Sequence, residues 1–196
     1  MHKRQALATF ISLGVLATAA FPQSRWVPFT AKFTISVDNV DASGRHNLTN
    51  QQGVRLRSSD GRTLEYTFTQ GTAQICCGTL NVPDNGVIYR LDYLTKRAVG
   101  TKMPNGHRGF PKMDILGHDT IAGMPAVGYP MLDAKSNRPD GEIWFASSDP
   151  DLVLRIKKPL PSGGLYTSEI TEIQYGSEPD AAQLQIPAGM EVAKPQ

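Results

Sequence analysis

Hydrophobic and polar residues alternate with a period of two along most of this chain. The clearest case is residues 29–37, in which every odd position is apolar and every even position is Thr, Lys or Ser. Successive side chains of a strand point to opposite faces of its sheet, so this pattern predicts a strand with one buried face. Similar patterns predict further strands at residues 54–57, 63–69, 87–93, 98–103, 120–131, 142–146, 152–157 and 166–175.

The segments between these strands contain turn residues. Asp60-Gly61 joins the second and third predicted strands, and glycine tolerates the positive φ that a two-residue hairpin loop needs. Residues 104–112 are rich in Gly and Pro, so we expect the most mobile loop there. Residues 178–184 are the main candidate for a short helix.

About nine or ten short strands with hairpin-scale turns indicate a mainly β protein. We expect a curved antiparallel sheet that forms an open or partly closed barrel with little helix. A two-sheet β-sandwich satisfies the same alternation and is the alternative architecture.

Residues 1–20 have the pattern of a secretory signal peptide. A basic start precedes an apolar run over residues 6–20, which ends in small residues. A membrane-spanning helix needs about 18 or more apolar residues, and this run is shorter. We therefore predict cleavage after Ala19 or Ala20, leaving a single β-rich domain over residues 21–196.

Loss of the signal changes the charge of the protein. The signal carries Lys3 and Arg4 and no acidic residue, so its loss takes the formal charge from +2 to zero. A neutral chain has no general attraction to nucleic acid, and we expect no nucleic-acid partner. No cysteine follows the cleavage site to carry a lipid, and no second long apolar segment is found. The expected product is soluble, exported to the periplasm or secreted, and without an integral membrane segment.

The two cysteines of the chain, Cys76 and Cys77, are adjacent. Adjacent residues in a strand point to opposite faces, and their Cα atoms lie about 3.8 Å apart, below the usual disulfide range. Two thiols, a strained vicinal disulfide, and an intermolecular bond or metal site are all open interpretations. A redox role requires the second or the third.

Aromatic residues on the apolar faces of the predicted strands suggest two interpretations. They belong to an ordinary core, or the curled sheet is incompletely filled and their rings line an apolar pocket for a lipid-like ligand. On the second interpretation the ligand-binding residues are Tyr66, Phe68, Tyr89, Tyr93 and Trp144.

The search for catalytic motifs finds little. The chain has no serine nucleophile elbow, no paired-histidine metalloprotease motif and no phosphate-binding glycine loop. We therefore assign no catalytic residue, metal ligand or cofactor. The candidates for an acid–base or metal group are His107, Asp114, His118 and Asp119. They straddle turns rich in Gly and Pro, and solvated loop residues are the simpler interpretation.

Five segments in order along the chain carry a family resemblance: residues 57–62, 116–123, 142–145, 170–173 and 186–189. Together they resemble a family of exported bacterial proteins of unknown function. More weakly, the chain is similar to outer-membrane lipoprotein carrier (Lol-type) proteins, which implies a curved sheet closed by helices over an apolar cavity. Residues 21–28 leave no room for a long N-terminal closing helix, so no binding residue is carried over.

These observations favour a noncatalytic extracytoplasmic binding or carrier-like protein for a hydrophobic or lipid-like ligand. The first alternative is an envelope module that binds another protein through a sheet edge or the loop at residues 104–112. The second alternative is an enzyme that uses a His/Asp or thiol site. The oligomeric state is left open.

Overall fold

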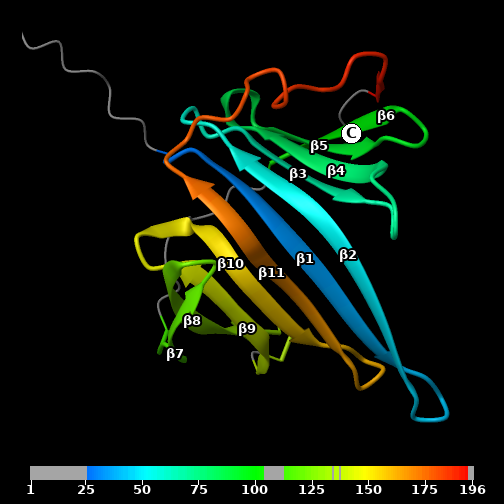
Figure 1. The fold of residues 1–196 in the computed structure, drawn as a ribbon, viewed down its shortest axis with the longest axis vertical. Coiled ribbons are helices and arrows are strands. Elements are labelled where there is room, and N and C mark those ends of the chain that lie inside the picture. Colours follow the sequence, from blue (N-terminus) through cyan, green and yellow to red (C-terminus); the bar gives the residue numbers. More distant parts are fainter. Residues whose placement is uncertain (1–25, 104–112, 134, 137, 194–196) are drawn as a thin grey trace, which may run out of the picture.

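Twelve strands form one continuous sheet in the described part of the chain (Figure 1). The structure is a computed structural model, and it describes residues 26–103, 113–133, 135–136 and 138–193. The strands are β1 (Phe29–Val40), β2 (His46–Arg57), β3 (Thr63–Phe68), β4 (Ile75–Val82), β5 (Val87–Asp92), β6 (Arg97–Lys102), β7 (Gly117–Ile121), β8 (Met124–Leu132), β9 (Pro139–Ala146), β10 (Asp149–Pro159), β11 (Leu165–Tyr175) and β12 (Glu191–Ala193). A short 3-10 turn, η1 (Pro83–Asn85), precedes β5.

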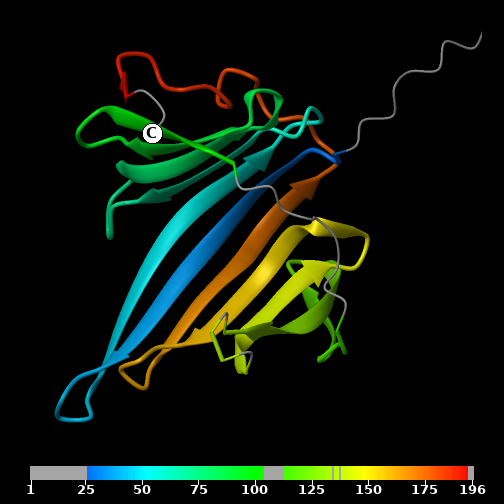
Figure 2. The ribbon, with the colours of Figure 1, turned by 180° about the vertical axis from the view of Figure 1, so that it is seen from behind.

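The sheet is curved and open, as both views of the ribbon show (Figures 1 and 2). Its strand order is β12-β6-β5-β4-β3-β2-β1-β11-β10-β9-β8-β7, so β12 and β7 are its two edges. Neighbouring strands are antiparallel, except that β12 runs parallel to β6. The expected mainly β open half-barrel is confirmed. The sandwich alternative is not found, because all the described strands belong to one hydrogen-bonded sheet.

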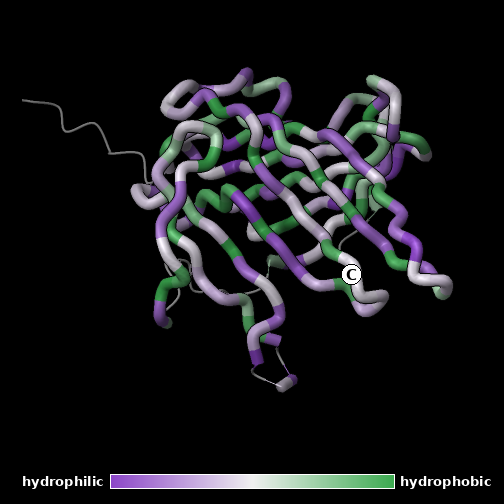
Figure 3. The backbone as a smooth tube through the Cα atoms, turned by 60° about the horizontal axis from the view of Figure 1, so that its bottom comes forward, coloured by the Kyte–Doolittle hydropathy of each residue, from purple (hydrophilic) through white to green (hydrophobic). Residues whose placement is uncertain are grey.

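The long strands β1, β2 and β11 form the middle of the sheet. β1 pairs with β2 over its full length and with β11 on its other side. Its burial follows the alternation predicted from the sequence, with Phe29, Ala31 and Phe33 buried. The same alternation of hydrophobic and hydrophilic positions is visible along the tube in Figure 3.

Two of the expected elements differ from the structure, and β4 and β12 are strands that the sequence did not predict. The single strand expected over residues 120–131 is two strands in the structure, because β7 and β8 form a hairpin whose turn is Ala122-Gly123. Both turn residues have positive φ, 50° and 78°, as a two-residue hairpin loop requires. The helix expected at residues 178–184 is wrong. Hydrogen-bonded turns between Asp180 and Leu184 take its place. The expected signal peptide and the loop at residues 104–112 lie outside the described residues.

The first core lies where β1 and β11 meet the strands from β7 to β10. Its buried apolar members are Phe29, Ala31, Phe33, Ile121, Ala126, Ala146, Leu152, Leu154 and Ile170. The ring of Phe33 extends over Gly53 of β2, where any Cβ would overlap it. Glycine at this position therefore leaves room for the Phe33 ring against β2.

The second core lies on β2 to β6 and includes the C-terminal segment, which we define as residues 177–190. Its buried members are Leu56, Leu64, Leu80, Leu91, Ala98 and Leu184. Ile186 and Met190 of the C-terminal segment also pack against it. This segment runs back over the end of the sheet formed by β3 to β6 (orange to red in Figures 1 and 2).

The second core and the arginines of β2 lie on opposite faces of the sheet, because Leu56 stands between Arg55 and Arg57 in an extended strand. Arg55 donates a hydrogen bond through Nη1 to the carbonyl oxygen of Val153 in β10 at 3.0 Å. Two strands, β1 and β11, separate β2 from β10, so a flat sheet would place this carbonyl beyond the reach of one side chain. The sheet therefore curls toward the face of Arg55, which we call the arginine face.

Arg57 anchors the same face with a buried ion pair. Its guanidinium pairs with Asp149 of β10, and the two side chains are only 3% and 9% exposed. Arg57 also donates through Nε to the carbonyl of Val27 at 2.8 Å and lies over the Phe29 ring at 4.8 Å. The Tyr175 hydroxyl donates to Asp149 at 3.1 Å. A buried charge needs such partners to offset its lost hydration.

Candidate functional site

An open groove of about 660 Å³ crosses the arginine face of β3 to β6. The register of the strands places its side chains in two rows across the sheet. One row is Glu65, Thr79, Arg90 and Val99, and the other is Thr67, Cys77, Asp92 and Arg97. Each row brings together four strands, so the groove depends on the pairing of the whole end of the sheet.

The two carboxylates of the groove already have partners. Glu65 accepts a hydrogen bond from Nε of Arg55 at 2.7 Å, which links the groove to the middle of the sheet. Asp92 accepts backbone N–H bonds from Leu94 and Thr95 at 3.0 and 2.9 Å and so fixes the turn between β5 and β6. The hydrogen bonds from Thr95 are the main cause that lowers the pKa of Asp92 below its usual value.

The two arginines of the groove are available for a ligand. Arg90 and Arg97 are exposed, and no salt bridge to either is found in the described ranges; Arg97 stands opposite Asp92 in the register and helps to lower the pKa of that carboxyl. Val99 stands beside Arg90 in the register and adds an exposed apolar side chain. Guanidinium groups bind carboxylates and phosphates through paired hydrogen bonds, so this arrangement suits a ligand with anionic groups.

A β-bulge places both cysteines on one side of β4. Thr67 pairs with Cys77 and Phe68 pairs with Ile75, so Cys76 is an extra residue in the strand. The cysteines are free thiols whose Sγ atoms lie 3.0 Å apart. Both lie near the Thr67 hydroxyl, at 3.3 Å for Cys76 and 3.2 Å for Cys77. The expectation that they point to opposite faces fails, because a bulge interrupts the alternation.

The aromatic residues predicted to bind a ligand separate into two places. Tyr66, Tyr89 and Tyr93 pack against the second core, and Trp144 packs against the first. Phe68 meets the ring of Tyr66 edge-on, with ring centroids 5.6 Å apart. Burial raises the pKa of the Tyr66 hydroxyl. Of the five, Tyr66 is the one that lines the groove. A ligand-binding role for the set stays a prediction.

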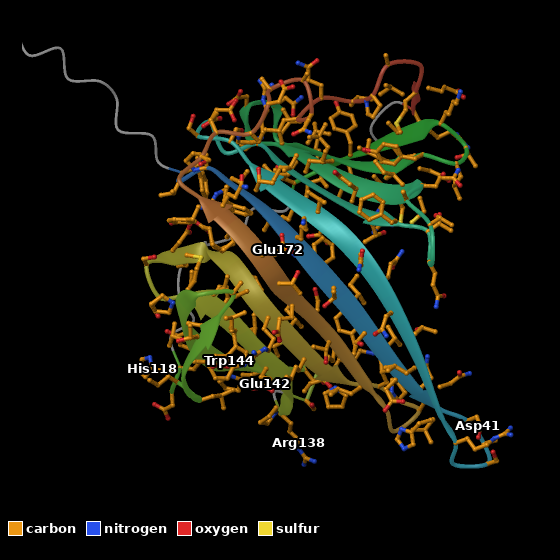
Figure 4. The ribbon with its side chains drawn as sticks, in the orientation of Figure 1. Asp41, His118, Arg138, Glu142, Trp144 and Glu172 are labelled. Atoms are coloured by element: carbon orange, nitrogen blue, oxygen red, sulfur yellow. The ribbon has the colours of Figure 1, made fainter. Side chains whose placement is uncertain are left out.

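Trp144 lies in a network of charged side chains at the other end of the sheet (Figure 4). Its Nε1 donates to Glu142 at 3.0 Å, and the guanidinium of Arg155 lies 5.7 Å from the centre of its ring. Arg155 also pairs with Asp119 of β7 at 2.7 Å. The hydrogen bond from Arg155 is the main cause that lowers the pKa of Asp119.

The acid–base candidates do not form a cluster in the described part of the chain. Asp119 is held by Arg155, while Asp114 and His118 are exposed. His107 lies outside the described residues. No group of three or more His, Cys, Asp or Glu residues suited to a metal ion is found among residues 26–103, 113–133, 135–136 and 138–193. No helix in these ranges is long and apolar enough to cross a membrane.

Comparisons with known proteins find similarity in the fold of the chain and none in its sequence. No family model matches the sequence, and no curated protein sequence matches it. An uncharacterised conserved protein from Thermus thermophilus is similar in structure, with a TM-score of 0.54 and 14% identity over 86% of this chain and 90% of that chain. At identities this low, similarity of structure establishes the fold alone.

Two further solved structures share this likeness. The complex of Pseudomonas aeruginosa MucA and MucB matches with a TM-score of 0.51 and 18% identity, over 87% of this chain and 59% of that chain. This chain therefore spans less than two thirds of the MucB-complex chain that it matches. A LolA superfamily protein from Nitrosomonas europaea matches with a TM-score of 0.39 and 11% identity, over 82% and 90% of the two chains. The LolA superfamily is the Lol-type group that the sequence resembles.

Sequence reasoning missed Arg90 and Arg97 as candidate binding residues. The alternation separates Arg90 and Asp92 from the apolar face of a predicted strand, and the structure has them on the arginine face. Their importance depends on the register with β4, and no strand was expected there. A row of polar residues across four strands becomes visible only once the pairing is known.

Proposed function

We propose that this protein is a noncatalytic binding protein of the cell envelope that holds an anionic segment of another polypeptide. The observation that carries the proposal is the groove on β3 to β6, in which Arg90 and Arg97 are exposed and Arg90 has no ion-pair partner in the described ranges. A partner that brings carboxylates to these guanidinium groups would satisfy them without a cost in buried charge.

The form of the groove supports a polypeptide as the partner. It is open along the sheet, and its two rows combine charged and hydroxyl side chains with the thiol of Cys77 and the apolar side chain of Val99. Protein interfaces combine such apolar contacts with a polar rim, whereas an acyl chain needs an enclosed apolar cavity. The neighbour from P. aeruginosa is a complex of MucB with another protein, MucA, which adds support for a protein partner on this fold.

The envelope location rests on the N-terminal sequence. Residues 1–20 have the basic start, apolar run and small-residue end of a cleaved export signal. Export would place the groove in the compartment where periplasmic or secreted partners are found. A lipid-like ligand, which the aromatic residues suggested, stays a prediction and is distinguished by the experiment below.

Site-specific photo-cross-linking in cells that export the full-length chain tests the proposal. A photoreactive residue at Thr79, in the groove, should give one dominant adduct with another polypeptide. The matched control is Lys102, which is exposed and lies on the other face of the same sheet end. Equal adducts at both positions, or none at Thr79, would contradict the proposal.

A charge reversal then tests the role of the arginines. Arg90→Glu should reduce the Thr79 adduct by about tenfold or more, since a favourable charge contact becomes repulsive. Lys102→Glu changes the net charge equally and should leave the adduct unchanged. Native mass spectrometry of the same preparations reports a retained lipid, and a lipid in place of a polypeptide would support the hydrophobic-ligand prediction instead.

A further inference from the structure

The Cys76–Cys77 pair has the geometry of a reactive dithiol. The bulge directs both thiols to one side of β4, with their Sγ atoms 3.0 Å apart. A disulfide needs about 2.05 Å, so the sulfur atoms must approach by about 1 Å, with a local change of the backbone. Cys77 is exposed and lines the groove, so an incoming reagent can reach the pair. Bulges are often found where a side chain is re-aimed for function.

The surroundings of the two thiols make them chemically unequal. Partial burial acts to raise the pKa of Cys76, but hydrogen bonds from the Cys77 thiol and the Thr67 hydroxyl outweigh it, so this pKa is lowered overall. Burial and the neighbouring Cys76 raise the pKa of Cys77, and Asp92 acts in the same direction. The thiolate form therefore concentrates on Cys76, and the thiolate is the nucleophile in disulfide chemistry.

We propose that Cys76 and Cys77 form a redox-active dithiol that undergoes thiol–disulfide exchange with disulfide-bearing molecules at the groove. Cys76 is the attacking residue and Cys77 the resolving residue. This inference goes beyond the proposed binding function, which requires no chemistry and does not depend on the cysteines. If the chain is exported, the pair works in a compartment where disulfides form and persist.

The exchange proceeds in two balanced steps. The Cys76 thiolate attacks one sulfur of the disulfide R–S–S–R′, which forms a Cys76–S–S–R bond and releases R′–S⁻. Cys77 loses its proton to R′–S⁻ and attacks the Cys76 sulfur, which forms the Cys76–Cys77 bond and releases R–S⁻, protonated from solvent. The attacked disulfide gains two electrons and becomes two thiols, and the protein dithiol loses two electrons and becomes a disulfide.

The bulge is also the place where β4 can accommodate ring closure. Adjacent Cα atoms lie about 3.8 Å apart, which is below the usual disulfide range, so closure requires a local change of backbone. Cys76 is the residue that has no partner in β3, so a change there need not break the ladder with Thr67. The Cys76 carbonyl accepts the Tyr93 N–H at 3.0 Å and ties the bulge to β5.

Thr67 acts as a positioning residue for the pair. Its hydroxyl lies within hydrogen-bonding distance of both sulfur atoms. Thr67→Val removes the hydroxyl and keeps the shape, so we expect Cys76 to react at least about threefold more slowly. Thr67→Ser keeps the hydroxyl and should restore the rate. If Thr67 had only a structural role, Thr67→Val would not react more slowly than Thr67→Ser.

Oxidised glutathione with intact-mass readout tests the dithiol directly. The full-length protein should lose two hydrogens, retain no glutathione, and become resistant to alkylation at both cysteines. Cys77→Ser should stop at the first step and retain one glutathione on Cys76. Cys76→Ser should react about tenfold more slowly than Cys77→Ser, because Cys77 is less ionised.

Several results would overturn the proposal. They are a stable glutathione adduct on the wild-type chain, a disulfide-linked dimer, two thiols that remain open to alkylation, or equal rates for the two single variants. None of these bears on the groove as a binding site, because the cross-linking at Thr79 can be performed with both cysteines replaced by serine. The two proposals can therefore fail separately.

Discussion

The two cores of this protein lie on opposite faces of one sheet. Phe29, Ala31 and Phe33 of the first core pair in register with Arg57, Arg55 and Gly53, so they lie on the arginine face. The second core is built on the other face of β2 to β6. Neighbouring strands cover the first core, whereas a C-terminal segment that has turns in place of a helix covers the second.

This difference explains why a groove is open at one end of the sheet. Where the strands from β7 to β10 fold back, the arginine face is filled by apolar side chains and a buried ion pair. On β3 to β6 the apolar side chains point toward the C-terminal segment, and the arginine face is left to polar residues. In both regions the alternation gives the sheet one apolar face. Which face of the sheet is apolar corresponds to the segment that covers it, the strands β7 to β10 in the first region and the C-terminal segment in the second.

Asp149→Ala should have the largest effect, and it should act on the first region. Removal of this carboxylate leaves the buried Arg57 guanidinium without its charged partner, which costs about 3–5 kcal/mol of unfolding free energy. Urea denaturation measures the change. Glu172→Ala is the control, because it breaks an ion pair with Lys32 whose side chains are 64% and 67% exposed, and should cost about 1 kcal/mol or less. Equal losses for the two variants would refute the distinction.

Leu184→Ala should weaken the second region selectively. This leucine is the residue of the C-terminal segment that is buried in the second core, and its truncation should cost about 2–4 kcal/mol. Hydrogen exchange should rise in β4 to β6 while the amides of β1 and β11 stay protected. Val192→Ala, at an exposed position near the same end of the chain, should change little. A uniform rise in exchange over both regions would mean that the two cores unfold as one.

Alanine substitutions at glycines that lie opposite aromatic rings test how tightly each of the two regions is packed. A Cβ at Gly128 would lie 2.8 Å from the ring of Trp144, and one at Gly100 would lie 3.1 Å from the ring of Tyr89. Gly128→Ala should therefore cost about 1–3 kcal/mol, and Gly100→Ala less than that. Thermal or urea unfolding of the two variants gives the order. A larger loss of stability for Gly100→Ala than for Gly128→Ala would show that the second core accommodates an added methyl group less well than the first.

The sequence predicted the class of fold, because alternation is a local signal that each strand carries by itself. The alternation over residues 29–33 already shows which side chains of β1 are buried. The division into two cores could not be predicted in this way. Alternation identifies an apolar face, but it does not say whether strands or the C-terminal segment will cover that face.

The candidate site was predicted less well, because it depends on register and on one irregularity. Cys76 and Cys77 were recognised as a pair, but the bulge that brings their thiols together leaves no mark in a two-residue pattern. Arg90 and Arg97 are ordinary polar residues until the pairing of β4 with β5 and of β5 with β6 aligns the rows of the groove.

The tip of the β1–β2 hairpin provides the smallest expected effect and an internal control, since it extends away from both cores (Figure 4). At this tip the Ser43 hydroxyl, with help from the Arg45 backbone N–H, lowers the pKa of Asp41 from 3.8 to about 2. A lowered folded-state pKa means that this carboxylate favours the folded tip above about pH 4, and the contribution disappears as the pH falls toward 2. Ser43→Ala should therefore raise the pKa of Asp41 toward 3.8, as measured by an NMR titration of the carboxyl carbon. The signals of both cores should be unchanged, and an unshifted Asp41 titration would show that the hydroxyl is not the main cause.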